Sequence, residues 1–215
     1  MLEVRRIKKK YSSKEYVLEN VEFSIEMGKC LFIRGVSGSG KTTLLNIIGL
    51  LDNPDEGEIL FNNENILLQD DNYRNIYRNE KIGIVFQKYN LLLSLTVLEN
   101  ILIPVLYRKF SEKKSFEERA KKILKSLNME SFIHRKVMDL SGGQQQRVAI
   151  ARVLLQDPTI ILADEPTANV DVETEKLVLE LLRNCKKQGK IVIIVSHNDI
   201  YKNIADYEFH LKRIE

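Results

Sequence analysis

The feature that most constrains the fold of this chain is a glycine-rich segment, Gly35-Val36-Ser37-Gly38-Ser39-Gly40-Lys41-Thr42. It fits the pattern G-x-x-x-x-G-K-[ST] and stands between an apolar run of buried-strand type, residues 30–33, and a helical run, Thr43–Gly49. Glycines let the backbone wrap around phosphates, so that successive N–H groups point inward. In this pattern Lys41 reaches the β- and γ-phosphates, and Thr42 offers its hydroxyl to Mg²⁺. The segment therefore predicts a nucleotide site between a strand and a helix.

A second glycine turn lies far downstream, in Leu140-Ser141-Gly142-Gly143-Gln144. A serine and two glycines before a helix-compatible run can aim a hydroxyl and backbone N–H groups at an anion, with a helix N-terminus behind them. A phosphate is the natural ligand of such a turn. Taken alone, the same residues also fit an ordinary glycine turn that opens a surface helix. Only the other motifs of the chain favour the phosphate.

Polar residues follow three further apolar strands. Asp164 and Glu165 end the strand that starts at Ile160, Gln87 ends a shorter one, and His197 ends another. Ligands in open α/β sheets bind at such strand ends. Asp164 is suited to hold Mg²⁺, directly or through water, and Glu165 to orient and deprotonate a water molecule. Taken alone, Gln87 is a polar edge residue and His197 a turn histidine, although a histidine there can also reach a γ-phosphate.

Strands alternate with helices along the chain, which predicts a mostly parallel sheet. Residues 1–34 are expected to form short strands. Residues 88–156 change character and become helical, so a helical block is expected to interrupt the sheet. Within it, Leu91–Val105 carries a helix-like apolar stripe, of which one or two leucines are expected to be exposed. Ser115-Phe116-Glu117-Glu118 has the form of a capping box that opens a helix.

Size and composition fit one globular domain. The 215 residues suffice for a sizeable core, and 44% hydrophobic and 29% charged residues are typical of soluble proteins. A net charge of +3 gives no reason to expect nucleic acid or anionic lipid as a partner. The chain shows no signal peptide or membrane span, so we expect a cytoplasmic protein. Cys30 and Cys185 stand far apart in apolar settings and are expected to be reduced and buried.

Taken together, the motifs resemble those of the ATP-binding subunit of ABC transporters, in that family's order and over nearly the whole chain. The similar segments are Gly35–Thr42 (Walker A), Gln87 (Q-loop), Leu140–Gln144 (LSGGQ signature), Ile160–Asp164 (Walker B) with the catalytic Glu165, Ala168–Asp171 (D-loop) and His197 (switch histidine). Tyr11 falls where the family stacks an aromatic ring on adenine. The signature with its downstream QQQRVAIAR is highly specific. More narrowly, GLLDNPDEGEI and IGIVFQKYNLLLSLTVLENILIP are similar to the lipoprotein-release and macrolide-export type of ATPase.

The resemblance implies the fold class α/β: a P-loop NTPase (RecA-like) core with an N-terminal antiparallel β part and an inserted α-helical subdomain. It implies a single ABC ATPase domain, residues 1–215, with the core at residues 1–87 and 157–215 and the helical subdomain at residues 88–156. Val36 and Val170 depart mildly from the family's usual Walker A and D-loop residues, and neither change removes a catalytic group.

The resemblance also implies roles for residues, with ATP and Mg²⁺ as cofactors. Glu165 orients the attacking water with His197 against the γ-phosphate, and Lys41 neutralises phosphate charge. Gln87, Thr42 and Asp164 form the expected Mg²⁺ site. The nucleotide contacts are expected from Tyr11, Gly35, Ser37, Gly38, Ser39, Gly40, Lys41, Thr42, Thr43, Ser141, Gly142, Gly143 and Gln144.

The implied function is an ATPase that dimerises head to tail on ATP and powers a separate permease on the inner face of the cell membrane. The cargo would be a peptide, lipoprotein or antibiotic. The alternative is a regulatory ATP switch that signals through a membrane partner without transport. A DNA-repair or translation ATPase would need a long coiled coil between the motifs or two ATPase units in one chain, and the sequence has neither.

Overall fold

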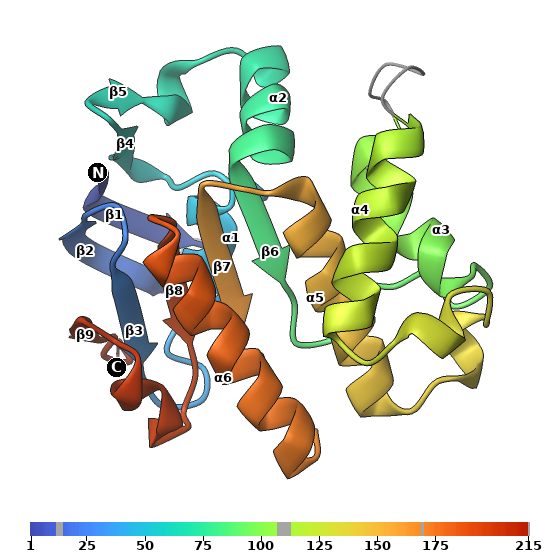
Figure 1. Cartoon of the computed structure of the whole chain (residues 1–215). Helices are drawn as coiled ribbons and strands as arrows, with labels where there is room; N and C mark the ends of the chain where they lie inside the picture. The colour runs from blue at the N-terminus through green and yellow to red at the C-terminus, as the bar shows by residue number, and fades with distance from the viewer. Residues whose placement is uncertain (12–14, 107–112, 169, 215) are drawn as a thin grey trace.

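Figure 1 shows the computed structural model of the chain, which describes residues 1–11, 15–106, 113–168 and 170–214. Two β-sheets, six α-helices and short 3₁₀ turns make up the described part. The strands are β1 (Leu2–Lys10), β2 (Tyr16–Ile25), β3 (Cys30–Arg34), β4 (Glu56–Phe61), β5 (Glu64–Asn65), β6 (Ile82–Val85), β7 (Ile160–Asp164), β8 (Ile191–Val195) and β9 (Tyr207–His210). The α-helices are α1 (Lys41–Ile48), α2 (Asp71–Lys81), α3 (Val97–Leu102), α4 (Lys113–Ser126), α5 (Gly142–Gln156) and α6 (Val172–Lys187). The 3₁₀ turns are η1 (Ile66–Leu68), η2 (Ile103–Val105), η4 (Glu130–Phe132), η5 (Val137–Asp139) and η6 (Asp199–Asn203).

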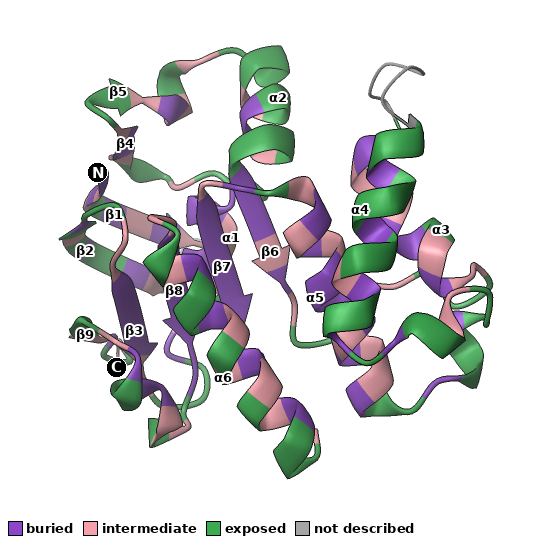
Figure 2. Ribbon diagram, in the orientation of Figure 1, coloured by how far each residue is buried: buried purple, intermediate pink, exposed green. Residues whose placement is uncertain are grey.

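The larger sheet is parallel, with the strand order β6-β7-β8-β3-β9. Its middle strands are apolar runs buried on both faces, as a sheet covered by helices on both sides requires, and Figure 2 shows them as buried. Successive side chains alternate between the two faces, so Leu31 and Ile33 of β3 join one core cluster, and Cys30 and Phe32 join the other. Because the strands are parallel, their carboxyl ends all lie at one edge.

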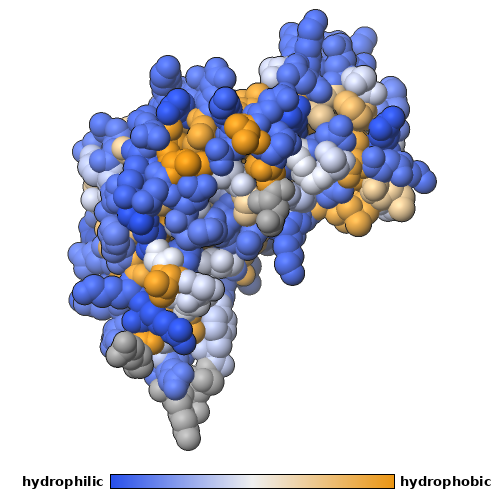
Figure 3. All heavy atoms as spheres, turned by 90° about the horizontal axis from the view of Figure 1, so that it is seen from below, coloured by the Kyte–Doolittle hydropathy of each residue, from blue (hydrophilic) through white to orange (hydrophobic). Residues whose placement is uncertain are grey.

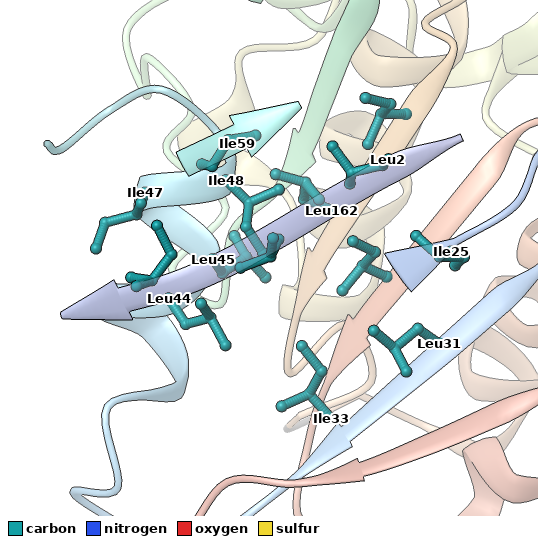
Figure 4. Packing of buried hydrophobic residues seen from close by; sticks show 14 of the residues in the cluster. Leu2, Ile25, Leu31, Ile33, Leu44, Leu45, Ile47, Ile48, Ile59 and Leu162 are labelled. Atoms are coloured by element: carbon teal, nitrogen blue, oxygen red, sulfur yellow. The ribbon is translucent and has the colours of Figure 1, made fainter. Parts of the chain in front are cut away.

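The smaller sheet is antiparallel, with the order β2-β1-β4-β5. Its strands β1 and β2 have 9 and 10 residues, so the expectation of short strands over residues 1–34 was wrong for these two, whereas β3, with five residues, is short as expected. The error arises because irregular register interrupts the alternation: β1 shifts register around Arg6, whose φ of 49° breaks the period-two pattern. The sheet packs on the parallel sheet through one face, with α1 between them. Figure 4 shows Leu44, Leu45, Ile47 and Ile48 of α1 among the apolar side chains of both sheets.

A third apolar cluster lies in the helical part between β6 and β7, where α3, α4 and α5 pack together. Helix α3 covers only Val97–Leu102, so the helix expected over Leu91–Val105 is much shorter. The reason is Asn100: its buried side chain accepts from the Leu92 N–H at 2.8 Å and donates to the Leu92 carbonyl at 2.9 Å, which folds the preceding segment into a loop.

Two further expectations concern this helical part. Helix α4 begins at Lys113, so Ser115 lies inside it and does not open it as expected. A capping box instead opens α3, where Thr96 pairs with Glu99. Two leucines of the apolar stripe, Leu92 and Leu93, are exposed, as expected.

The fold class is confirmed: an α/β protein with a parallel core, an antiparallel β part and a helical part inserted between β6 and β7. Cys30 and Cys185 are buried and free, as expected. Within the described ranges, no helix combines the length and the apolar character needed to cross a bilayer.

Candidate functional site

A cavity of about 680 Å³ lies at the carboxyl edge of the parallel sheet. Figure 3 views the molecule from this side, toward which the strand arrows of Figure 1 point, and most of the surface there is hydrophilic. The cavity is lined by Val17, Ser37, Gly38, Gly40, Lys41, Thr42, Thr43, Gln87, Asp164, Glu165 and His197. The fold thus gathers the segments after β3, β6, β7 and β8 that the sequence marked separately.

The loop after β3 owes its shape to glycines with left-handed backbone angles. Gly38 and Gly40 have φ of 77° and 88°, and a Cβ on Gly40 would lie 2.7 Å from the Val17 carbonyl oxygen. Gly40 is also the N-cap of α1, so the helix begins directly at the cavity. A helix N-terminus with free backbone N–H groups favours an anionic ligand there.

The side chain of Lys41 is held by backbone carbonyl groups of the same loop. Its ammonium donates to the carbonyl oxygens of Gly35 at 2.8 Å and Val36 at 2.9 Å. These contacts keep a full positive charge at the cavity wall, where a bound phosphate would meet it.

Thr42 and Asp164 form an oxygen-lined corner of the cavity. The Thr42 hydroxyl donates to the Asp164 carboxylate at 2.8 Å, and Asp164 is only 6% exposed. Burial raises the pKa of Asp164, and the neighbouring Glu165 charge acts in the same direction, whereas Thr42 and Lys41 lower it. A buried carboxylate beside a hydroxyl is the donor chemistry that Mg²⁺ prefers, and the cation's charge would offset the cost of burying the carboxylate. The residues present therefore fit this ion, with Gln87 exposed at the same cavity.

Glu165 is held by the segment that follows β8. Its carboxylate accepts from the Ser196 hydroxyl at 2.6 Å and from the His197 backbone N–H at 3.1 Å, and it lies 2.7 Å from His197 Nδ1. The backbone of Glu165 is left-handed, with φ of 45°, a conformation that costs a non-glycine residue about 1–3 kcal/mol. The Glu165 N–H donates to the Val195 carbonyl at 2.9 Å, which fixes this turn.

Sequence reasoning missed Ser196, although it stands between the apolar strand and His197. The hydroxyl is buried and bound to Glu165, whereas the His197 side chain is 77% exposed. The signal was a polar residue at the end of a fully buried strand.

Four of the expected nucleotide contacts, Ser141 to Gln144, do not line the cavity. Ser141 is the N-cap of α5, where Gln144 N–H donates to its hydroxyl at 3.4 Å and Ser141 N–H donates to Gln144 Oε1 at 3.0 Å. The turn is exposed at Ser141 and Gly142. The exposed side of this turn is therefore presented outside the cavity of its own chain.

Gly143 has a packing role that the sequence did not reveal. A Cβ there would lie 2.7 Å from Asp171 Oδ2 and 3.0 Å from the Thr174 hydroxyl. Asp171 caps α6 by accepting from the Thr174 N–H at 2.8 Å, and Arg147 of α5 donates to the Thr174 hydroxyl at 3.0 Å. The starts of α5 and α6 are thus in direct contact. The D-loop residue Asn169 lies outside the described residues.

Three other expected contacts stand apart from the cavity lining. Gly35 and Ser39 belong to the phosphate loop but do not line the cavity. A Cβ on Gly35 would clash with the Ser39 hydroxyl, and the Ser39 N–H donates to the Val36 carbonyl at 3.2 Å. The buried Ser39 hydroxyl has no hydrogen-bond partner within the described part of the chain. Tyr11 is 63% exposed, and its hydroxyl donates to Asp52 at 2.7 Å.

Known proteins resemble this chain over most of its length. Residues 18–168 match the family model described as ABC transporter. The chain belongs to the ABC transporter family. Within that family, the cassette is 44% identical to an uncharacterised ABC transporter ATP-binding protein, MJ0796, of Methanocaldococcus jannaschii, over 99% of this chain and 93% of the relative. It is also 37% identical to the lipoprotein-releasing system ATP-binding protein LolD 2 of Rhodopirellula baltica, over 96% of this chain and 84% of the relative.

Two further comparisons concern longer and solved proteins. The cassette is 40% identical to the macrolide export ATP-binding/permease protein MacB of Bdellovibrio bacteriovorus, over 93% of this chain but 31% of that protein. Its fold superposes on the solved MJ0796 cassette, described as a dimer in a post-hydrolysis state bound to ADP and Pi, with a TM-score of 0.91 at 39% identity; the alignment covers 100% of this chain and 97% of the other. The chain is therefore an ABC ATPase that is similar to the ATP-binding parts of proteins named for lipoprotein release and macrolide export.

Proposed function

We propose that this cassette binds ATP with Mg²⁺, dimerises head to tail on it, and uses hydrolysis to drive a separate membrane permease. The observation that carries the proposal is that the cavity and the glycine turn at Ser141 lie apart within one chain. The cavity holds the groups suited to the triphosphate and to hydrolysis, whereas the anion-binding turn at Ser141 points elsewhere. A second subunit can supply the turn that each cavity lacks, so that ATP joins two surfaces.

The arrangement of side chains suggests how hydrolysis proceeds. Water attacks the γ-phosphorus while the bond from that phosphorus to the oxygen bridging to ADP breaks, and Glu165 accepts the proton of the attacking water. Ser196 and His197 hold the Glu165 carboxylate in place. Lys41 stabilises the negative charge on the phosphate oxygens. Thr42, Asp164 and Gln87 would hold Mg²⁺, which neutralises β- and γ-oxygen charge when bound.

A groove next to the cavity supports the permease as partner. It has a volume of about 510 Å³ and lies among α2, β6, η2 and α5. Its walls combine apolar residues such as Ile84, Phe86 and Pro104 with the basic residues Arg78 and Arg152. Such a groove suits the apolar face of a short helix carrying a carboxylate. Phe86 of the groove directly precedes Gln87 of the cavity in the sequence. A partner in the groove would therefore contact a residue adjacent to the ATP site.

The exposed Leu92, two residues after Asn90 of the groove wall, offers a test of the permease interaction. Leu92→Glu is expected to reduce recovery of the membrane subunit with the tagged cassette, solubilised in mild detergent, by at least tenfold, because a charge would be buried without a partner. Leu68→Glu is the matched control, since Leu68 is 82% exposed on turn η1, does not line the groove and should leave recovery unchanged. Equal recovery with both variants would contradict this docking face.

The names of the relatives support a cargo class. LolD 2 is described as part of a lipoprotein-releasing system, and MacB as a macrolide exporter. We propose that the permease of this cassette exports or extracts a peptide, lipoprotein or antibiotic, and that the cassette lies on the inner face of the membrane through the permease. Reconstitution of the purified complex with each cargo class tests this, because only the true cargo should stimulate ATP hydrolysis.

A further inference from the structure

A hydrogen-bonded cluster joins the end of β1 to the segment after α1. The Tyr11 hydroxyl donates to Asp52 Oδ2 at 2.7 Å, and the Lys9 ammonium donates to Asp52 Oδ1 at 2.8 Å. Lys9 also donates to the Asn53 carbonyl at 2.6 Å. Each oxygen of the Asp52 carboxylate therefore binds one of the two side chains, and the phenol and the ammonium are held at a fixed separation.

The two faces of the Tyr11 ring differ. The Lys9 ammonium lies 5.0 Å from the ring centroid, at a distance typical of a cation–π contact. Lys9 is 8% exposed, whereas Tyr11 is 63% exposed. One ring face is thus occupied by a buried cation, and the ring leaves an aromatic surface open to solvent.

The cluster is also tied to the helix that carries the phosphate-binding residues. The N–H groups of Leu51 and Asp52 both donate to the Asn46 carbonyl of α1, at 2.8 and 3.3 Å. Burial and the Asp52 carboxylate raise the pKa of the Tyr11 phenol, whereas the Thr43 hydroxyl lowers it. Through Asp52, the Tyr11 ring is therefore tied to α1, the helix that begins at the phosphate loop.

We infer that Lys9 and Asp52 are positioning residues for the base of the nucleotide: they hold the Tyr11 ring as a stacking surface without touching the nucleotide themselves. This inference rests on the proposed binding of ATP in the adjoining cavity. An exposed tyrosine without these two contacts loses rotamer freedom when a base stacks on it, and that loss of entropy weakens binding. Asp52 holds the Tyr11 hydroxyl and Lys9 covers one face of the ring, so the ring is already ordered before the base binds. Less of the stacking energy is then lost to ordering the side chain, and the affinity for the base is higher.

The inference separates the base from the phosphates, so two ligands test it. Calorimetry would compare magnesium ATP with magnesium tripolyphosphate, which lacks the base and the sugar. Tyr11→Ala is expected to weaken ATP binding by about tenfold or more, as the loss of one base–aromatic stack does. Asp52→Ala and Tyr11→Phe each remove the hydrogen bond that orders the ring at position 11. Each is therefore expected to weaken ATP binding by about threefold, since the ring must be ordered when the base binds. Tripolyphosphate affinity should stay unchanged in all three variants.

Controls distinguish positioning from a general structural role. The double variant Tyr11→Phe with Asp52→Ala should bind ATP no more weakly than the weaker single variant, since both remove one contact. Lys9→Met should weaken ATP binding by about threefold like Asp52→Ala, and Lys10→Met, which removes a similar cation–π pair at Tyr16, should not.

The possible failures are separable. ATP affinity unchanged by Asp52→Ala, or an equal loss of ATP and tripolyphosphate affinity, would overturn the positioning role. Wild-type ATP affinity in Tyr11→Ala would overturn stacking on Tyr11 but leave the ATP site standing. Absence of ATP binding by the wild-type chain would overturn the proposed function itself.

Discussion

Replacing Glu165 by glutamine is expected to slow ATP hydrolysis by about 10²–10⁴-fold while leaving ATP affinity close to that of the wild type. The Glu165 carboxylate lines the cavity, where it can accept a proton from water, and its side chain is only 12% exposed and held by Ser196 and His197. The other carboxylate of the cavity, Asp164, instead accepts a hydrogen bond from the Thr42 hydroxyl. A glutamine has the same shape and can still pair with the Ser196 hydroxyl, but it cannot accept the proton. The binding groups around Lys41 are untouched.

Phosphate release measured under saturating ATP gives the hydrolysis rate, and calorimetry on the same variant gives the affinity. Glu180→Gln is a suitable control, because Glu180 is exposed on α6, away from the cavity, and should hydrolyse ATP at the wild-type rate. Wild-type turnover by Glu165→Gln would remove this carboxylate from the mechanism.

Replacing Lys41 by alanine is expected to weaken ATP binding by about 10- to 150-fold, the loss that follows from one charge-assisted hydrogen bond of about 1.5–3 kcal/mol. The variant loses the cation that faces the phosphates. It also leaves the carbonyl oxygens of Gly35 and Val36 without their donor, so the loop becomes less well ordered.

Calorimetric titration with ATP checks this second result, and circular dichroism shows whether the variant is folded. Lys176→Ala removes an exposed lysine from α6 and should bind ATP like the wild type. An unchanged ATP affinity in folded Lys41→Ala would contradict the role of the phosphate loop.

Much of the parallel core can be predicted from the sequence because its strands are buried on both faces. Runs such as Ile160–Asp164 and Ile191–Val195 are apolar at almost every position, and their polar ends mark the edge where ligands bind. The glycine pattern before α1 is equally clear, since its left-handed backbone at Gly38 and Gly40 excludes most other residues.

Three of the contacts that the sequence did not predict join segments that are distant along the chain. Ser196 meets Glu165, Gly143 meets Asp171, and Asp52 meets Tyr11, and none of these pairs follows from a local periodicity. The helical part was also harder to predict, because a single buried side chain, Asn100, folds an apolar stretch into a loop. Local patterns specify elements, whereas the site depends on how the elements meet.

The central claim, that ATP joins two copies of this cassette, is tested most directly by light scattering on Glu165→Gln. Slow hydrolysis in this variant preserves the bound ATP, so that any ATP-joined species persists during the measurement. The account predicts a monomer mass without nucleotide and a dimer mass with magnesium ATP at high protein concentration. A monomer mass under saturating ATP at that concentration would contradict it.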